Sequence, residues 1–204
     1  MQDFEPAQPN KPKSGTPWKW VAIGCGGCLG LSVLLTAAIA YFASRALNFS
    51  MDPQAVEGKA QELFDYEIPG ESRGLLNMNI MGIELTQVAD TQEPPGVLLT
   101  MGQLPNYLRD ENAQTSFIES FQQEMAQDGG YQLQVERTET LPLCGQSVSV
   151  RIAEGTFEGT ETTQAVSYLA VVEHEGSERF AWIVANGDTA DSMARGVFDS
   201  LVCK

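Results

Sequence analysis

The chain has 204 residues, with 27 Asp plus Glu against 12 Lys plus Arg, a net charge of −15 and a single histidine. An excess of negative charge of this size repels nucleic-acid phosphates and anionic lipid headgroups, so we expect no nucleic-acid partner. The length suits one folded domain with a short additional segment.

The first 17 residues contain four prolines, little apolar content and no periodic pattern. Such a segment is too short and too polar to bury a core. We therefore expect residues 1–17 to form a disordered tail.

An uncharged apolar stretch follows, covering 23 consecutive positions from residue 21 to residue 43. At ~1.5 Å of rise per residue a helix of this length measures ~35 Å, enough to cross a ~30 Å hydrocarbon core. We predict one transmembrane anchor over residues 18–45, in contact with the lipid bilayer through residues 21–43. The competing interpretation is a cleaved signal peptide, whose apolar region is shorter, ~7–15 residues.

Flanking positive charge predicts the orientation of this anchor. Lys11, Lys13 and Lys19 precede it, whereas Arg45 is the only basic residue after it until Lys59. Because Lys and Arg concentrate on the cytoplasmic side, the tail should be cytoplasmic and residues 46–204 exported. The expected location is a bacterial inner membrane, with the C-terminal domain in the periplasm or a lumen.

Small residues are frequent in the first half of the predicted anchor. Gly26 and Gly30 form a G-x-x-x-G pair on one helix face, which allows two helices to approach closely. A homodimer through this face is one interpretation. The other is that small residues are simply common in membrane helices.

Residues 46–204 contain 25 Asp plus Glu against 8 Lys plus Arg and are long enough for one core. Helices are predicted for about three turns after Asp52-Pro53, over 112–126, and from a cap at Asp188 to the end. Strands are predicted near 75–81, 83–85, 97–101, 131–135, 148–152, 166–172 and 180–184. This order predicts an α+β domain with an antiparallel sheet flanked by helices.

Four local features resemble the PsbP-like fold, which a photosystem II lumenal subunit, Ran-binding proteins and bacterial lipoproteins share. They are Tyr66-Glu67-Ile68-Pro69 as an early strand, a central helix with Phe117 and Phe121, Gly145-Gln146 at the start of a strand, and a long hairpin before a final helix ending Phe198-Asp199-Ser200-Leu201. The resemblance covers about residues 52–203. It implies a fold and carries no functional residue across.

Two cysteines, Cys144 and Cys203, lie in the predicted exported domain. An oxidising compartment permits a disulfide between them, and the alternative is two separate buried thiols. We predict that they lie within bridging reach, because both are expected at the same rim of the sheet.

Acidic residues offer one weak candidate for a metal site. Glu154, Glu158 and Glu161 surround two glycines, and Ca²⁺ accepts such oxygen ligands in flexible loops. Their spacing does not match an EF-hand loop, so a charged hairpin loop is the preferred interpretation.

The only histidine, His174, is predicted in a solvated hairpin turn, which gives no reason to expect a metal or a catalytic triad. We therefore predict no cofactor and no enzymatic activity, with a hydrolase as the remaining catalytic option. The expected function is protein interaction or assembly with an unknown protein partner. The alternative is a binding module for a small ligand or a divalent cation.

Overall fold

A computed structural model describes residues 47–204 except 81, 109 and 160. These residues fall in a single unit, Ala46–Lys204. The tail, the anchor and the Gly26 and Gly30 pair lie outside the described residues and stay predictions. Among the helices described, none has the length and apolar character needed to cross a bilayer.

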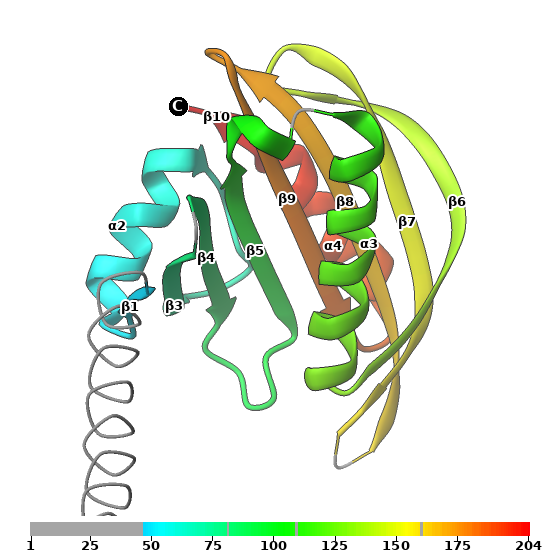
Figure 1. Ribbon diagram of the computed structural model, residues 1–204. Coiled ribbons are helices and arrows are strands. Elements are labelled where there is room, and N and C mark those ends of the chain that lie inside the picture. Colours follow the sequence, from blue (N-terminus) through cyan, green and yellow to red (C-terminus); the bar gives the residue numbers. More distant parts are fainter. Residues whose placement is uncertain (1–46, 81, 109, 160) are drawn as a thin grey trace, which may run out of the picture. The chain divides into compact units, whose positions relative to one another are not determined.

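The domain is built on one eight-stranded sheet in which every pair of neighbouring strands is antiparallel. Its order is β1-β3-β4-β5-β9-β8-β7-β6, so β1 and β6 are the two edges (Figure 1). The strands are β1 (Leu47–Ser50), β3 (Ser72–Ile80), β4 (Ile83–Asp90), β5 (Val97–Leu104), β6 (Tyr131–Leu143), β7 (Gln146–Glu158), β8 (Thr162–His174) and β9 (Ser177–Asn186). A separate pair joins β2 (Phe64–Asp65) to β10 (Val202–Cys203).

Helices cover both faces of the sheet. They are α2 (Pro53–Leu63), α3 (Glu111–Asp128) and α4 (Ala190–Ser200), with a short 3₁₀ turn η1 (Asn106–Leu108) before α3. Buried residues of α2 and α4 share one apolar cluster with one face of the sheet, and buried residues of α3 share another with the opposite face. Figure 1 shows α3 in front of the strands and α4 behind them.

Aromatic packing fixes α3 on its face. Phe121 of α3 meets the rings of Phe180 and Trp182 of β9 edge to face, with centroids 5.5 Å and 6.0 Å away. Phe180 and Trp182 are 1% exposed, as expected for the largest side chains of a core. Successive side chains of β9 point to opposite faces of the sheet. Phe180 and Trp182 therefore lie on the α3 face, and Ala181 and Ile183 lie on the other face.

The predicted fold class, an α+β domain with an antiparallel sheet and flanking helices, is confirmed. The first helix begins where its sequence indicates, since Asp52 Oδ1 accepts hydrogen bonds from the backbone amides of Gln54 and Ala55. The predicted helix over 112–126 is α3, extended by a residue at its start and two at its end.

Three local predictions of helices and strands were wrong: the start of the last helix, its end, which is Ser200 because β10 follows, and the early strand. The cap of α4 is Thr189, one residue beyond Asp188, and its side chain makes no capping bond. The chain turns at Gly187, whose carbonyl accepts from the Ala190 amide, and this delays the helix. The early strand is Phe64–Asp65, placed by its pairing with β10, and residues 66–69 lie outside any strand.

Candidate functional site

Two tight hairpin turns lie at one end of the sheet. Cys144 and Gly145 join β6 to β7, and Glu175 and Gly176 join β8 to β9. All four residues have positive φ, which is the pattern of a two-residue type I′ turn. This geometry keeps the flanking strands paired to their last residue, so His174 is both the final residue of β8 and the first residue of the turn.

A disulfide joins the first of these turns to the C-terminus. Cys144 and Cys203 are bonded, with their Cα atoms 5.2 Å apart and 59 positions between them in sequence. Cys203 also pairs with Phe64 through β10 and β2. The bond therefore ties the end of the chain to the sheet and to the strand that leaves α2.

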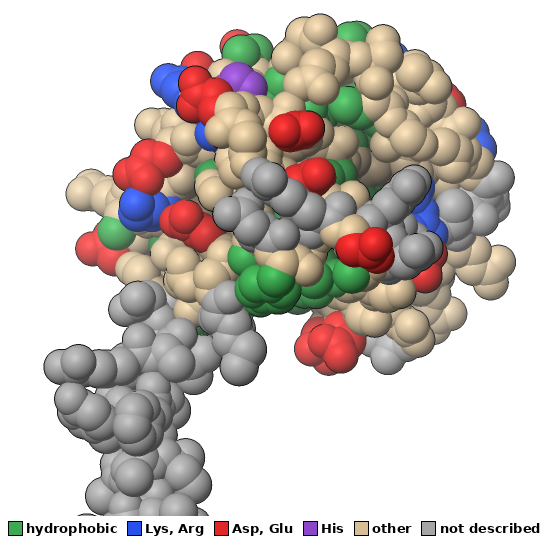
Figure 2. Space-filling model, turned by 45° about the horizontal axis from the view of Figure 1, so that its top comes forward, with side chains coloured by type: hydrophobic (Ala, Val, Ile, Leu, Met, Phe, Trp, Pro, Cys, Tyr) green, Lys and Arg blue, Asp and Glu red, His purple; other side chains and the backbone are tan. Residues whose placement is uncertain are grey.

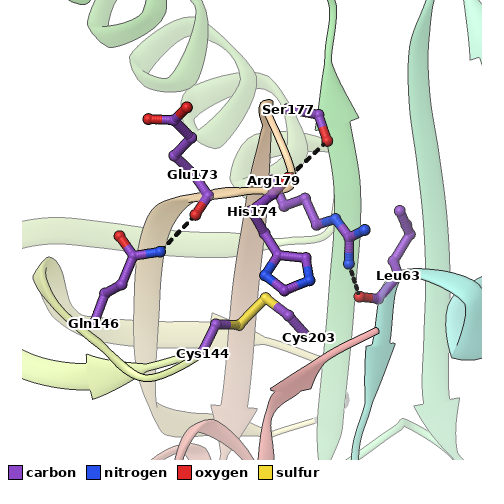
Figure 3. Close-up of a disulfide and its surroundings, with 8 residues drawn as sticks. All are labelled: Leu63, Cys144, Gln146, Glu173, His174, Ser177, Arg179 and Cys203. Carbon is purple, nitrogen blue, oxygen red and sulfur yellow. Dashed lines mark hydrogen bonds between the residues drawn. A yellow bond between two sulfur atoms is a disulfide. The ribbon is translucent and has the colours of Figure 1, made fainter.

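The imidazole of His174 lies beside this disulfide (Figure 3). The side chain is half-buried and lines a cavity of about 370 Å³ with both cysteines, Asp199 and Leu201. The prediction of a solvated turn histidine was therefore wrong about its environment. No described residue forms a hydrogen bond with the ring, so it lacks the orienting partner on which a triad depends.

Arg179 is the most enclosed cation at this end of the sheet. It is 7% exposed and donates from Nη1 to the backbone oxygen of Leu63, 2.6 Å away (Figure 3). Leu63 is the last residue of α2, where unpaired carbonyls give a helix a partial negative charge. The backbone amide of Lys204 donates to the same oxygen at 3.4 Å.

On the side of the sheet covered by α4, charged groups form a network. Arg137 pairs with Glu139, Glu154 and Asp191, and Arg195 pairs with Glu139. The hydrogen bonds that Arg137 donates to Glu139 and then to Glu154 raise the pKa of its guanidinium. The carboxylate of Glu154 is thus already neutralised by a guanidinium.

The three glutamates proposed as weak metal ligands do not gather. Glu154 and Glu158 are four residues apart on β7, ~13 Å along an extended strand. Glu158 accepts a hydrogen bond from Gln132 Nε2 at 2.6 Å, and Glu161 is exposed beyond the end of the strand. No group of three or more His, Cys, Asp or Glu side chains suited to a metal occurs within the described part of the chain.

A groove of about 440 Å³ lies on the opposite face, between the first half of α3 and strands β7 and β8. Its lining mixes apolar with polar side chains: Gln114, Ile118, Gln146, Ser147, Val148, Ser149, Arg151, Leu169, Ala170, Val171, Val172 and Glu173. Arg151 pairs with Glu119 of α3 at 3.2 Å. Sequence reasoning placed the strands and the helix of this groove but did not identify the groove.

No protein-family model matches this sequence. No curated protein matches it either. Among solved structures, the chain is similar to LpqN, described as involved in cell envelope biogenesis of Mycobacterium tuberculosis. The identity is 12%, the TM-score is 0.37, and the match covers 68% of this chain and 82% of LpqN. A likeness of this size carries no residue role from LpqN to this chain.

Proposed function

We propose that this chain is a single-pass protein of a bacterial inner membrane, which carries a folded PsbP-like domain outside the cytoplasm and acts by contact with another protein. Residues 21–43 would span the bilayer and residues 1–17 would stay inside. The charge-free stretch and the lysines before it support this topology. The bond between Cys144 and Cys203 supports an oxidising compartment for the domain.

The groove beside α3 is the observation that carries the protein-contact role. Its floor includes Ile118 and Leu169, which are 6% and 2% exposed, while Ser147 and Ser149 are exposed hydroxyls. Apolar floors rimmed by hydrogen-bonding groups are typical of protein interfaces. The groove also lies near the β6 edge, away from β1, which follows the predicted anchor in the chain.

Crosslinking in the native membrane tests this role. A photo-reactive residue replaces Ser149 in the groove, and a matched variant carries it at Ser192, an exposed serine of α4 on the other face. We expect an adduct with one reproducible protein from Ser149 and none from Ser192. Adducts equal at the two positions, or none at Ser149, would contradict the proposal.

Protease accessibility tests the topology separately. Protease added to intact spheroplasts should digest residues 46–204 and spare the N-terminal tail. Protection of the C-terminal domain would reverse the orientation and remove the argument from an oxidising compartment.

The cavity beside the disulfide favours a second function, the binding of a small ligand. Its volume of about 370 Å³ falls in the range of ligand pockets, and His174 and Asp199 supply polar groups. A thermal-shift screen of small anions, sugars and Ca²⁺ on residues 46–204 tests it. A ligand whose stabilising effect disappears in His174→Ala would favour this function over protein contact.

A further inference from the structure

One row of directly opposed residues crosses half of the sheet on the face that carries α3. Phe49 pairs with Met78, Met78 with Leu85, Leu85 with Gly102, and Gly102 with Phe180. Because directly opposed residues point to the same face, these four side chains and the Gly102 backbone form a continuous strip.

The strip is buried at one end and open at the other. Phe180 is 1% exposed and packs against Phe121 of α3, and Leu85 is 6% exposed. Met78 is half-buried, while Phe49 is 57% exposed at the edge strand. α3 packs over β9, and no helix within the described residues covers the strands towards β1 on this face.

The open end of the strip is apolar and free of charge. Besides Phe49 and Met78, the strand register brings Leu76 and Ile83 to this face, both half-buried. Met51, directly after β1, is 65% exposed. We call this surface the β1–β4 apolar face. Figure 2 shows a group of hydrophobic side chains at the lower margin of the view, with acidic side chains next to it and over the rest of the surface.

Exposed apolar surface of this kind marks a contact site in a domain with so many charges. The charged residues of the same strands do not lie on the β1–β4 apolar face. Glu84 points to the opposite face, since it alternates with Leu85, and Arg73 lies beyond the bulge of β3, paired with Glu93 at 3.8 Å.

The position of this face along the chain indicates its occupant. The apolar stretch of the predicted anchor ends at Ala43, and Phe49 follows six residues later. Six residues of fully extended chain span at most about 20 Å, so Phe49 cannot lie farther than that from the edge of the hydrocarbon core. The headgroup region begins at that edge, and apolar side chains of surface-bound proteins enter it by ~5–10 Å.

We propose that the β1–β4 apolar face rests on the outer leaflet of the membrane, with Phe49 and Met51 in the interfacial layer. The contact would hold the domain in one orientation relative to the bilayer. This inference rests on the membrane anchor of the proposed function. The strong negative charge of the domain makes a zwitterionic leaflet the more favourable surface.

Photo-crosslinking of the full chain in phosphatidylcholine vesicles tests the contact. Benzoylphenylalanine replaces Phe49 in one variant and Met51 in a second. The matched control is Val202, which is 55% exposed on β10, outside the large sheet. We expect lipid adducts, identified by mass, at positions 49 and 51 and none at 202.

Flotation of the same samples separates the two proposals. Chain that fails to float with the vesicles would overturn the anchor and this contact together. Chain that floats but gives no lipid adduct at 49 and 51, or equal adducts at 202, would overturn the contact and leave the anchor standing. An adduct with a second copy of the chain would show that the face is a dimer interface and also overturn it.

Discussion

Arg179 donates its hydrogen bond to Leu63 across 116 positions of sequence, joining β9 to the last carbonyl of α2. It is also the exception among the described Lys and Arg side chains, because each of the others has a carboxylate within 4.0 Å. The partial negative charge at the end of α2 thus takes the place of a carboxylate.

This environment predicts how substitutions at Arg179 change stability. Arg179→Ala should lower the free energy of unfolding by about 2–3 kcal/mol, through the lost hydrogen bond and the lost packing of the side-chain stem. Arg179→Met keeps the packing and removes a costly buried cation, so it should stay within about 1 kcal/mol of wild type. Urea denaturation of residues 46–204 measures both. A Met variant as unstable as the Ala variant would mean that the charge itself stabilises the fold.

Gly102 is required by the close packing of the strip that it crosses. A Cβ atom at this position would collide with the ring of Phe180 and with the backbone oxygen of Glu84. Gly102→Ala should therefore cost about 1–3 kcal/mol, as overpacking of a core does.

Gly58 is the matched control for this substitution. It is an exposed residue of α2, and no other atom lies within 4 Å of the position that an alanine Cβ would occupy, so Gly58→Ala should stabilise by up to about 1 kcal/mol. Thermal unfolding of both variants gives the comparison. Equal effects at the two glycines would contradict the packing around Gly102.

The sequence predicts most of the sheet because its signals are local. Alternation along β6 and β7 indicates which residues share a face, and Asp52-Pro53 marks the start of α2. Positions of Cys144 and Cys203 near one rim were also expected, since each ends or follows a predicted element.

Long-range relationships could not be predicted in the same way. β1 is four residues long, and β2 and β10 are two residues long, so their apolar periods are too short to detect. The sequence around Arg179 does not distinguish it from the other arginines. Its burial depends on the C-terminal end of α2, where Leu63 accepts its hydrogen bond. The position of the His174 ring beside the disulfide likewise depends on the type I′ turn. The Glu175-Gly176 pair is not one of the residue pairs from which this turn type is predicted.

Tyr168 predicts a pH dependence of stability. Burial raises the pKa of this phenol above its ordinary value of 10.0, and its 3.0 Å hydrogen bond to Asp191 raises it further. From pH 10 upward the unfolded chain loses this proton while the folded domain keeps it, so stability falls as pH rises through the folded pKa. Below pH 10 the contribution is fully present.

Tyr168→Phe should remove the part of the stability loss above pH 10 that comes from Tyr168. Tyr66 and Tyr131, whose pKa values burial also raises, leave a smaller slope in the variant. The measurement is the free energy of unfolding between pH 8 and pH 11 for both proteins. Identical slopes would show that Tyr168 is not the titrating group.

The disulfide should contribute substantially to stability. Closing a loop of ~60 residues stabilises by about 4 kcal/mol in the chain-entropy model, although measured effects are often smaller. We expect Cys144→Ala with Cys203→Ala to lose about 2–4 kcal/mol under oxidising conditions. Wild type treated with dithiothreitol should unfold at the same denaturant concentration as the variant. Equal stability of oxidised wild type and variant would mean that the bridge does not constrain the unfolded chain.

His174 should not bind zinc in the oxidised protein. Its ring lies beside the disulfide, and both cysteine sulfurs are bonded to each other and cannot serve as thiolate ligands. Among the described residues, Asp199 is the only one with a carboxylate that lines the same cavity, and a stable zinc site in a protein needs at least three ligands. Added Zn²⁺ should therefore leave the melting temperature of residues 46–204 unchanged, in wild type and in His174→Ala alike, because only a ligand that binds the native state stabilises it. Repeating the titration after reduction frees both thiols beside the imidazole and serves as the positive control. A zinc-dependent rise in the oxidised protein that disappears in His174→Ala would contradict the prediction and identify the disulfide end of the sheet as a metal site.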